Sequence, residues 1–160
     1  MNMKRKYRLI ICFLLGLDVL SMYIIRLQQH SIKTWKKTAE KNIGLFMLMN
    51  QWVRVKQEGK KLDAYFINNN YQKIAVYGMS YIGLRIIREL KDSEIEIAYG
   101  IDKRAEELSS DLKLFTLEDD LPDIDAVVVT LLSEYDEVYE AISTKVNCPV
   151  IAIEDIFNEV

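Results

Sequence analysis

Three residues in the middle of the chain have the spacing of a phosphate-binding turn. Gly78, Ser80 and Gly83 occupy the three fixed positions of the pattern Gly-x-Gly-x-x-Gly. In that pattern the first glycine makes a tight turn, the second lets phosphate approach the backbone, and the third lets a helix pack on a strand. Here Ser80 replaces the second glycine and Tyr81 adds bulk beside it, although a serine hydroxyl can itself donate to a phosphate oxygen. The pattern therefore predicts a phosphate-binding turn with a narrowed cradle.

An aspartate and a threonine lie at the ends of two expected strands beyond this turn. Asp102 is 24 residues past Gly78, where a carboxylate can accept hydrogen bonds from the hydroxyls of a ribose. A strand-end aspartate can equally form a turn, and Lys103 or Arg104 could meet a phosphate instead. Thr130 follows an apolar run at the edge where open α/β sheets bind ligands. The candidate cofactor-binding residues are Gly78, Ser80, Tyr81, Gly83, Asp102 and Thr130.

The sequence predicts neither a catalytic residue nor a metal site. His30 is the only histidine, which removes histidine-based triads and most zinc sites. Cys12 and Cys148 have no metal-ligand spacing, and Gly83 is not followed by the lysine of a Walker-type loop. The acidic residues 118–120 flank a turn, where carboxylates are more often solvated than bound to magnesium. The balance favours a binding module over an enzyme.

From residue 71 onward, strand-like and helix-like segments alternate. Alternation of this kind is typical of a parallel sheet covered on both faces, and right-handed crossovers favour the doubly wound topology. We therefore predict an α/β fold with a doubly wound, five-stranded parallel sheet of order 3-2-1-4-5. The expected strands are 73–77, 94–101, 113–115, 125–130 and 149–153, and the expected helices are 82–90, 105–109 and 134–143.

Residues 34–70 are expected to form a helical connector that leads into this domain of residues 71–160. Apolar residues recur at steps of three and four, which predicts one apolar helix face that ends near Gly59. A short helix over residues 62–67 should follow. The apolar face could bind a partner, but packing on the chain's own domain is the more common role. Its residues are Leu45, Leu48, Met49, Trp52 and Val55.

The apolar segment Leu9–Leu27 predicts a membrane anchor within residues 1–33. As a helix, residues 9–25 would extend roughly 25 Å, slightly short of a ~30 Å hydrocarbon layer. Asp18 costs about 2.5–3.5 kcal/mol on insertion, while each Leu or Ile returns about 0.3–0.6 kcal/mol. The alternatives are a cleaved signal peptide, although no small-residue cleavage site follows the apolar run, and a soluble partner-binding helix.

Charge divides the chain into a basic and an acidic part. Residues 1–41 carry nine Lys and Arg against two acids, a net +7, and residues 42–160 carry twelve against twenty-two, a net −10. A globular part of −10 is poorly suited to nucleic acid. Basic residues flank the apolar segment on both sides, so their count does not set its orientation. Without a disulfide framework, we expect a single-pass protein of the inner membrane whose globular part is cytoplasmic.

Four segments resemble small Rossmann-like modules of bacterial surface-polysaccharide and nucleotide-sugar pathways. They are Lys73–Gly78, Tyr99–Asp102, Leu121–Thr130 and Cys148–Ile156. Similar modules form the C-terminal domain of some sugar C-methyltransferases, and the likeness covers about residues 42–156. The resemblance implies a nucleotide-type ligand, either NAD or a nucleotide sugar, near Gly78, Gly83 and Asp102. It also implies polysaccharide-assembly enzymes as partners.

The sequence thus predicts a membrane-tethered, non-catalytic Rossmann-like module that binds a nucleotide-type ligand. One alternative is a nicotinamide-dependent enzyme that acts on a nucleotide sugar. The other is a structural adaptor without a ligand, in which Tyr81 and its neighbours fill the pocket.

Overall fold

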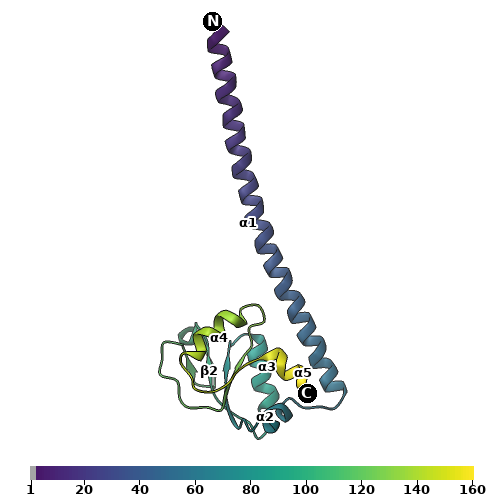
Figure 1. The fold of residues 1–160 in the computed structure, drawn as a ribbon. Coiled ribbons are helices and arrows are strands. Elements are labelled where there is room, and N and C mark those ends of the chain that lie inside the picture. Colours follow the sequence, from purple (N-terminus) through teal and green to yellow (C-terminus); the bar gives the residue numbers. More distant parts are fainter. Residues whose placement is uncertain (1–2) are drawn as a thin grey trace. The chain divides into compact units, whose positions relative to one another are not determined.

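The computed structural model describes residues 3–160, with side-chain environments for residue 13 and for residues 16–160. The chain divides into two compact units, one up to residue 42 and one over residues 43–160. The long helix α1 (Met3–Gln57) accounts for the first unit and contributes its C-terminal part to the second (Figure 1). The second unit contains the sheet and all the other helices.

The structure does not support the transmembrane helix predicted over Leu9–Leu27. None of the helices, over the part of the chain that the structure describes, combines the length and the apolar character needed to cross a membrane. From Gly16 onward the apolar side chains of α1 share the helix with Asp18, Arg26 and Lys33. The side chains of residues 9–12, 14 and 15 lie outside the described residues. A location at the inner membrane stays a prediction.

A five-stranded parallel sheet forms the centre of residues 43–160. Its order is β3-β2-β1-β4-β5, and each neighbouring pair is parallel, which confirms the predicted order. Ile74 lies between Ile97 of β2 and Ala126 of β4, so β1 is the central strand. The strands are β1 (Lys73–Tyr77), β2 (Glu96–Ile101), β3 (Leu114–Phe115), β4 (Ala126–Val129) and β5 (Val150–Ala152).

Helices cover both faces of the sheet (Figure 1). Strand residues alternate between two cores: Ile74 and Val76 belong to one, whereas Ala75 and Tyr77 belong to the other. The end of α1, with α2, α3 and α5, packs on the first face, and α4 packs on the second. These helices are α2 (Asp63–Asn68), α3 (Tyr81–Leu90), α4 (Tyr135–Ser143) and α5 (Ile153–Glu159), and a 3-10 helix, η1 (Ala105–Glu107), follows β2.

The end of α1 packs on the domain as the apolar stripe predicted. Leu48, Trp52 and Val55 are buried in the first core, and the Trp52 ring contacts the Phe157 ring at a centroid distance of 5.0 Å. The helix ends at Gln57, just before Gly59, which has a φ of +70°. Met49 departs from the expected face, since 41% of it is exposed.

The C-terminus differs from the expected strand over residues 149–153. The strand β5 ends at Ala152, and Ile153 begins α5. Ile153, Ile156 and Phe157 are buried in the first core. The apolar residues at the end of the chain therefore serve both a strand and a short helix, a division that a continuous apolar run does not reveal.

Tyr99 on β2 generates a testable prediction about alkaline stability. Its hydroxyl donates to the carbonyl oxygen of Pro122 at 2.8 Å, and burial raises the pKa of Tyr99 to about 12, as it does for Tyr65. The folded protein thus holds these protons between pH ~10 and ~12, where the unfolded chain has lost them. This contribution to stability is complete below pH ~10 and disappears as the pH rises towards ~12.

In Tyr99→Phe, the free energy of unfolding at pH 7 should fall by about 1 kcal/mol, because the hydrogen bond to the Pro122 carbonyl is lost. The decline in stability between pH ~10 and ~12 should also become shallower than in the parent protein. Urea unfolding over this pH range measures both effects. Tyr139→Phe is the matched control, since Tyr139 is 45% exposed. An unchanged alkaline slope in Tyr99→Phe would contradict the assignment.

Candidate functional site

The turn between β1 and α3 has the tight geometry that the glycine pattern predicts. Gly78 has a φ of +93°, a left-handed conformation that side chains disfavour, and its N–H donates to the carbonyl oxygen of Ile101 at 2.8 Å. A Cβ atom at Gly78 would lie 2.8 Å from Oγ1 of Thr130. The first position of the pattern therefore requires glycine for both conformation and space.

Gly83 is the point of closest approach between α3 and β1. A Cβ atom there would lie 2.1 Å from the carbonyl oxygen of Gly78, a distance that no rotamer change can relieve because both atoms are fixed to the backbone. Gly83 thus has the packing role of the third glycine in the pattern. It allows the N-terminus of α3 to begin directly above the end of β1.

Thr130 lies beneath the turn instead of facing outward. It is 1% exposed, and its hydroxyl lies 3.0 Å from the carbonyl oxygen of Tyr77 and 2.9 Å from that of Gly78. A hydroxyl has one proton, so it donates to one of these carbonyls at a time. This geometry gives Thr130 a positioning role for the turn, while a direct contact with a ligand stays a prediction.

Ser80 and Tyr81 leave the outer side of the turn open. Ser80 is the N-cap residue of α3, is exposed, and makes no side-chain capping hydrogen bond. Tyr81 is 58% exposed, so its ring does not fill an interior pocket. The first backbone N–H groups of a helix have no partner within the helix, and the helix dipole favours an anion there. Ser80 and Tyr81, which were expected to narrow the phosphate-binding turn, therefore do not close it.

Asp102 is held over the same turn by backbone donors. Its Oδ2 accepts the N–H of Met79 at 2.8 Å, and its Oδ1 accepts the N–H of Arg104 at 2.9 Å. An ionised carboxylate offers about four lone-pair positions, so these two bonds fix its orientation and leave others for hydroxyl donors. Asp102 thus joins the turn after β1 to the end of β2, a geometry that fits both the turn-forming role and the ribose-binding role expected from the sequence.

Tyr77 lies below Asp102 at the end of β1 and is 2% exposed. Burial is the main cause that raises the pKa of Tyr77, and the negative charge of Asp102 raises it further. The phenol therefore stays protonated at neutral pH and carries no charge that would repel a phosphate.

A cavity of about 670 Å³ adjoins the residues that follow Asp102 and β3. This volume falls within the range of small-molecule sites, roughly 300–1,000 Å³. Asp119 is anchored at its rim by accepting the N–H and the hydroxyl of Thr116 at 2.7 and 2.9 Å. Two cations and four carboxylates line the cavity, which suits a neutral base better than a phosphate. Its lining residues are Lys103, Arg104, Glu106, Glu107, Thr116, Leu117, Glu118 and Asp119.

The structure brings most of the predicted site residues to one edge of the sheet. Gly78, Ser80, Gly83 and Asp102 surround the start of α3, with Thr130 beneath them. Sequence reasoning missed the Met79 amide that orients Asp102, and it missed the cavity beyond β3. The spacing of Thr116 and Asp119 was an available sign of a side-chain-stabilised turn there.

Comparisons with known proteins provide no further guide to this site. No protein-family model, no curated protein and no solved structure matches the chain. Among the described residues, no group of three or more His, Cys, Asp or Glu side chains comes together as metal ligands. The turn, Asp102 and the adjoining cavity are therefore the features that indicate a function.

Gly83→Ala should destabilise the protein by about 3 kcal/mol, because the added methyl group forces the start of α3 away from β1. Chemical denaturation of the full chain measures this loss. Gly44→Ala, within α1, is the matched control, since its Cβ atom would lie 3.6 Å from the Leu132 side chain, an ordinary van der Waals distance. That control should be neutral or stabilising by up to ~1 kcal/mol. Equal stability of the two variants would refute the close approach.

Proposed function

We propose that residues 43–160 form a non-catalytic Rossmann-like module that binds a nucleotide-type ligand, NAD or a nucleotide sugar. The carrying observation is that the carboxylate of Asp102 is fixed over the open turn at the start of α3. The phosphates would bind the N–H groups that begin α3, and the ribose hydroxyls would donate to Asp102. Ligands of open α/β sheets bind at this edge, where the strand order reverses.

The adjoining cavity supports a position for the base. Lys103 and Arg104 line it and directly follow Asp102, so a ribose held by Asp102 would place its base next to this space. The resemblance to modules of surface-polysaccharide pathways supports a nucleotide sugar as the ligand and assembly enzymes as partners. A role at the inner face of the membrane belongs to the same proposal, and fractionation of cells that express the full chain tests it.

Ser80 offers a variant that changes charge while preserving the helix cap. Ser80→Asp and Ser80→Asn both supply a good N-cap residue, so both variants should fold as the parent does. The aspartate would place a negative charge where the phosphates bind, and the asparagine would not. Calorimetric titration of the full chain with NAD and with UDP-glucose should show micromolar binding of at least one ligand, retained in Ser80→Asn and lost in Ser80→Asp.

The contribution of Asp102 can be measured against a second carboxylate of the same kind. Asp102→Ala should weaken binding by roughly 10–100-fold, the equivalent of about 1.5–3 kcal/mol for hydrogen bonds to a charged group. Asp125 also accepts two backbone N–H groups, from Gln72 and Lys73 at 2.8 and 2.7 Å, but at the opposite end of β1. Asp125→Ala should therefore leave the affinity unchanged.

Three results would contradict the proposal. Binding of neither ligand by the folded parent chain overturns it and favours the structural adaptor. Equal affinities of Ser80→Asp and Ser80→Asn for the ligand would show that its phosphates do not bind at the start of α3. Turnover of a nucleotide sugar with reduction of NAD, followed by nicotinamide absorbance, favours the enzyme over the non-catalytic module.

A further inference from the structure

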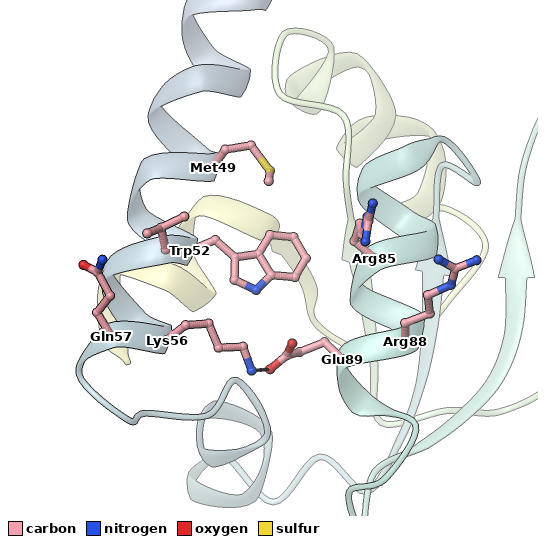
Figure 2. Close-up of a pocket in the computed structure, with 8 residues that line it drawn as sticks. Met49, Trp52, Lys56, Gln57, Arg85, Arg88 and Glu89 are labelled. Atoms are coloured by element: carbon pink, nitrogen blue, oxygen red, sulfur yellow. Dashed lines mark hydrogen bonds and ion pairs between the residues drawn. The ribbon is translucent and has the colours of Figure 1, made fainter.

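A second cavity, of about 660 Å³, lies between the C-terminal part of α1 and α3, within residues 43–160. Figure 2 shows Met49 and Trp52 reaching from α1 toward α3, with Lys56 and Glu89 meeting below them. None of its lining residues belongs to the turn, to Asp102 or to the cavity beyond β3. They are Met49, Trp52, Val53, Lys56, Gln57, Arg85, Arg88 and Glu89.

The charges that line this cavity leave an excess of cations. Lys56 forms an ion pair with Glu89, so these two charges compensate each other. Arg85 and Arg88 are exposed on the same side of α3, and neither guanidinium has an ion-pair or hydrogen-bond partner among the described residues. Two unpaired guanidinium groups thus line the same cavity, and their planar donors match the oxygens of a carboxylate or a phosphate.

Trp52 supplies a donor in the apolar part of the cavity. Trp52 is 8% exposed and its ring is packed against Phe157, yet its indole N–H has no acceptor among the described residues. No buried side-chain nitrogen or oxygen of the described residues lacks a partner, so this N–H is accessible from the cavity. A tightly packed aromatic ring with an accessible donor is typical of a binding surface.

The wall on α1 is apolar. Met49 and Val53 are 41% and 51% exposed and lie one turn apart, on either side of Trp52 in sequence. Large apolar side chains that stay exposed beside a cavity favour an apolar ligand group. The cavity therefore has an apolar wall on α1 and a cationic wall on α3.

We propose that this cavity binds a small amphipathic anion, an acyl or alkyl group that ends in a phosphate or a carboxylate. The apolar group packs on Met49, Trp52 and Val53, and the anionic end is held by Arg85 and Arg88. This inference does not depend on the nucleotide hypothesis, since the two sites share no residue.

Charge disfavours the basic part of a second copy as the occupant. Residues 1–41 carry a net charge of +7, which the two arginines would repel. An acidic helical peptide would match the charge, but a cavity of this volume fits a small ligand, whereas a docked helix needs a larger surface. The peptide is therefore treated as a competing outcome of the test.

The test uses the full chain in a Trp35→Phe background, so that the remaining tryptophan, Trp52, reports on the cavity. Titration with octyl phosphate and with octanoate should change the Trp52 fluorescence with saturation. Inorganic phosphate and octyltrimethylammonium should have no comparable effect, because the first lacks the apolar group and the second has the wrong charge. Vesicles of phosphatidylglycerol form a separate arm that distinguishes a membrane lipid from a soluble ligand of the same chemistry.

Arg85→Gln/Arg88→Gln should weaken the binding of octyl phosphate by roughly a hundredfold, about tenfold for each charged hydrogen-bonding group. Lys103→Gln/Arg104→Gln removes the same charge at the other cavity and should leave this affinity unchanged. NAD or UDP-glucose titrations of the Arg85→Gln/Arg88→Gln variant should match the parent, which separates the two proposals.

Several outcomes would overturn the assignment. Equal affinity for octyltrimethylammonium would show that the apolar wall alone causes binding. An unchanged affinity in Arg85→Gln/Arg88→Gln would place the anion elsewhere. Binding of an acidic helical peptide without any binding of octyl phosphate would make the cavity part of a protein interface.

Discussion

The approach of Gly83 to the carbonyl oxygen of Gly78 is the constraint on which both candidate sites depend. This contact sets the position at which α3 begins above β1, and Thr130 holds the same turn from below. Because α3 is a rigid ten-residue helix, its first amides and its outward arginines are positioned together. The N-terminal end of α3 faces the sheet edge that carries Asp102, and its outer side faces the end of α1. One backbone contact therefore determines the geometry at two separate surfaces.

The turn is stabilised almost entirely by groups that a ligand would leave in place. Thr130 bonds backbone carbonyls, and Asp102 uses only two of its acceptor positions for Met79 and Arg104. The Ser80 hydroxyl makes no capping bond. A ligand at the start of α3 would thus add hydrogen bonds without breaking the bonds that hold the turn, which is the condition for a preorganised site.

The sequence predicted the sheet well because buried strands appear in it as apolar runs and the crossovers appear as helical segments between them. The alternation of strand-like and helix-like segments after residue 71, with right-handed crossovers, was sufficient for the strand order. The start of α5 at Ile153 was missed because a buried strand and a short buried helix have the same apolar composition. The predicted membrane span lacks support because, among the described residues, no helix is both long and apolar enough to cross a membrane. The cavity between α1 and α3 could not be predicted, since it depends on which helix faces which, and Arg85 and Arg88 are ordinary surface residues in a single sequence.

The two outer strands of the sheet are much shorter than the central ones. β3 has two residues and β5 has three, whereas β1 has five. An outer strand exposes unpaired N–H and C=O groups along one side, and a long one can recruit a strand from another molecule. With so few groups available at either margin, the sheet offers little template for intermolecular β-pairing.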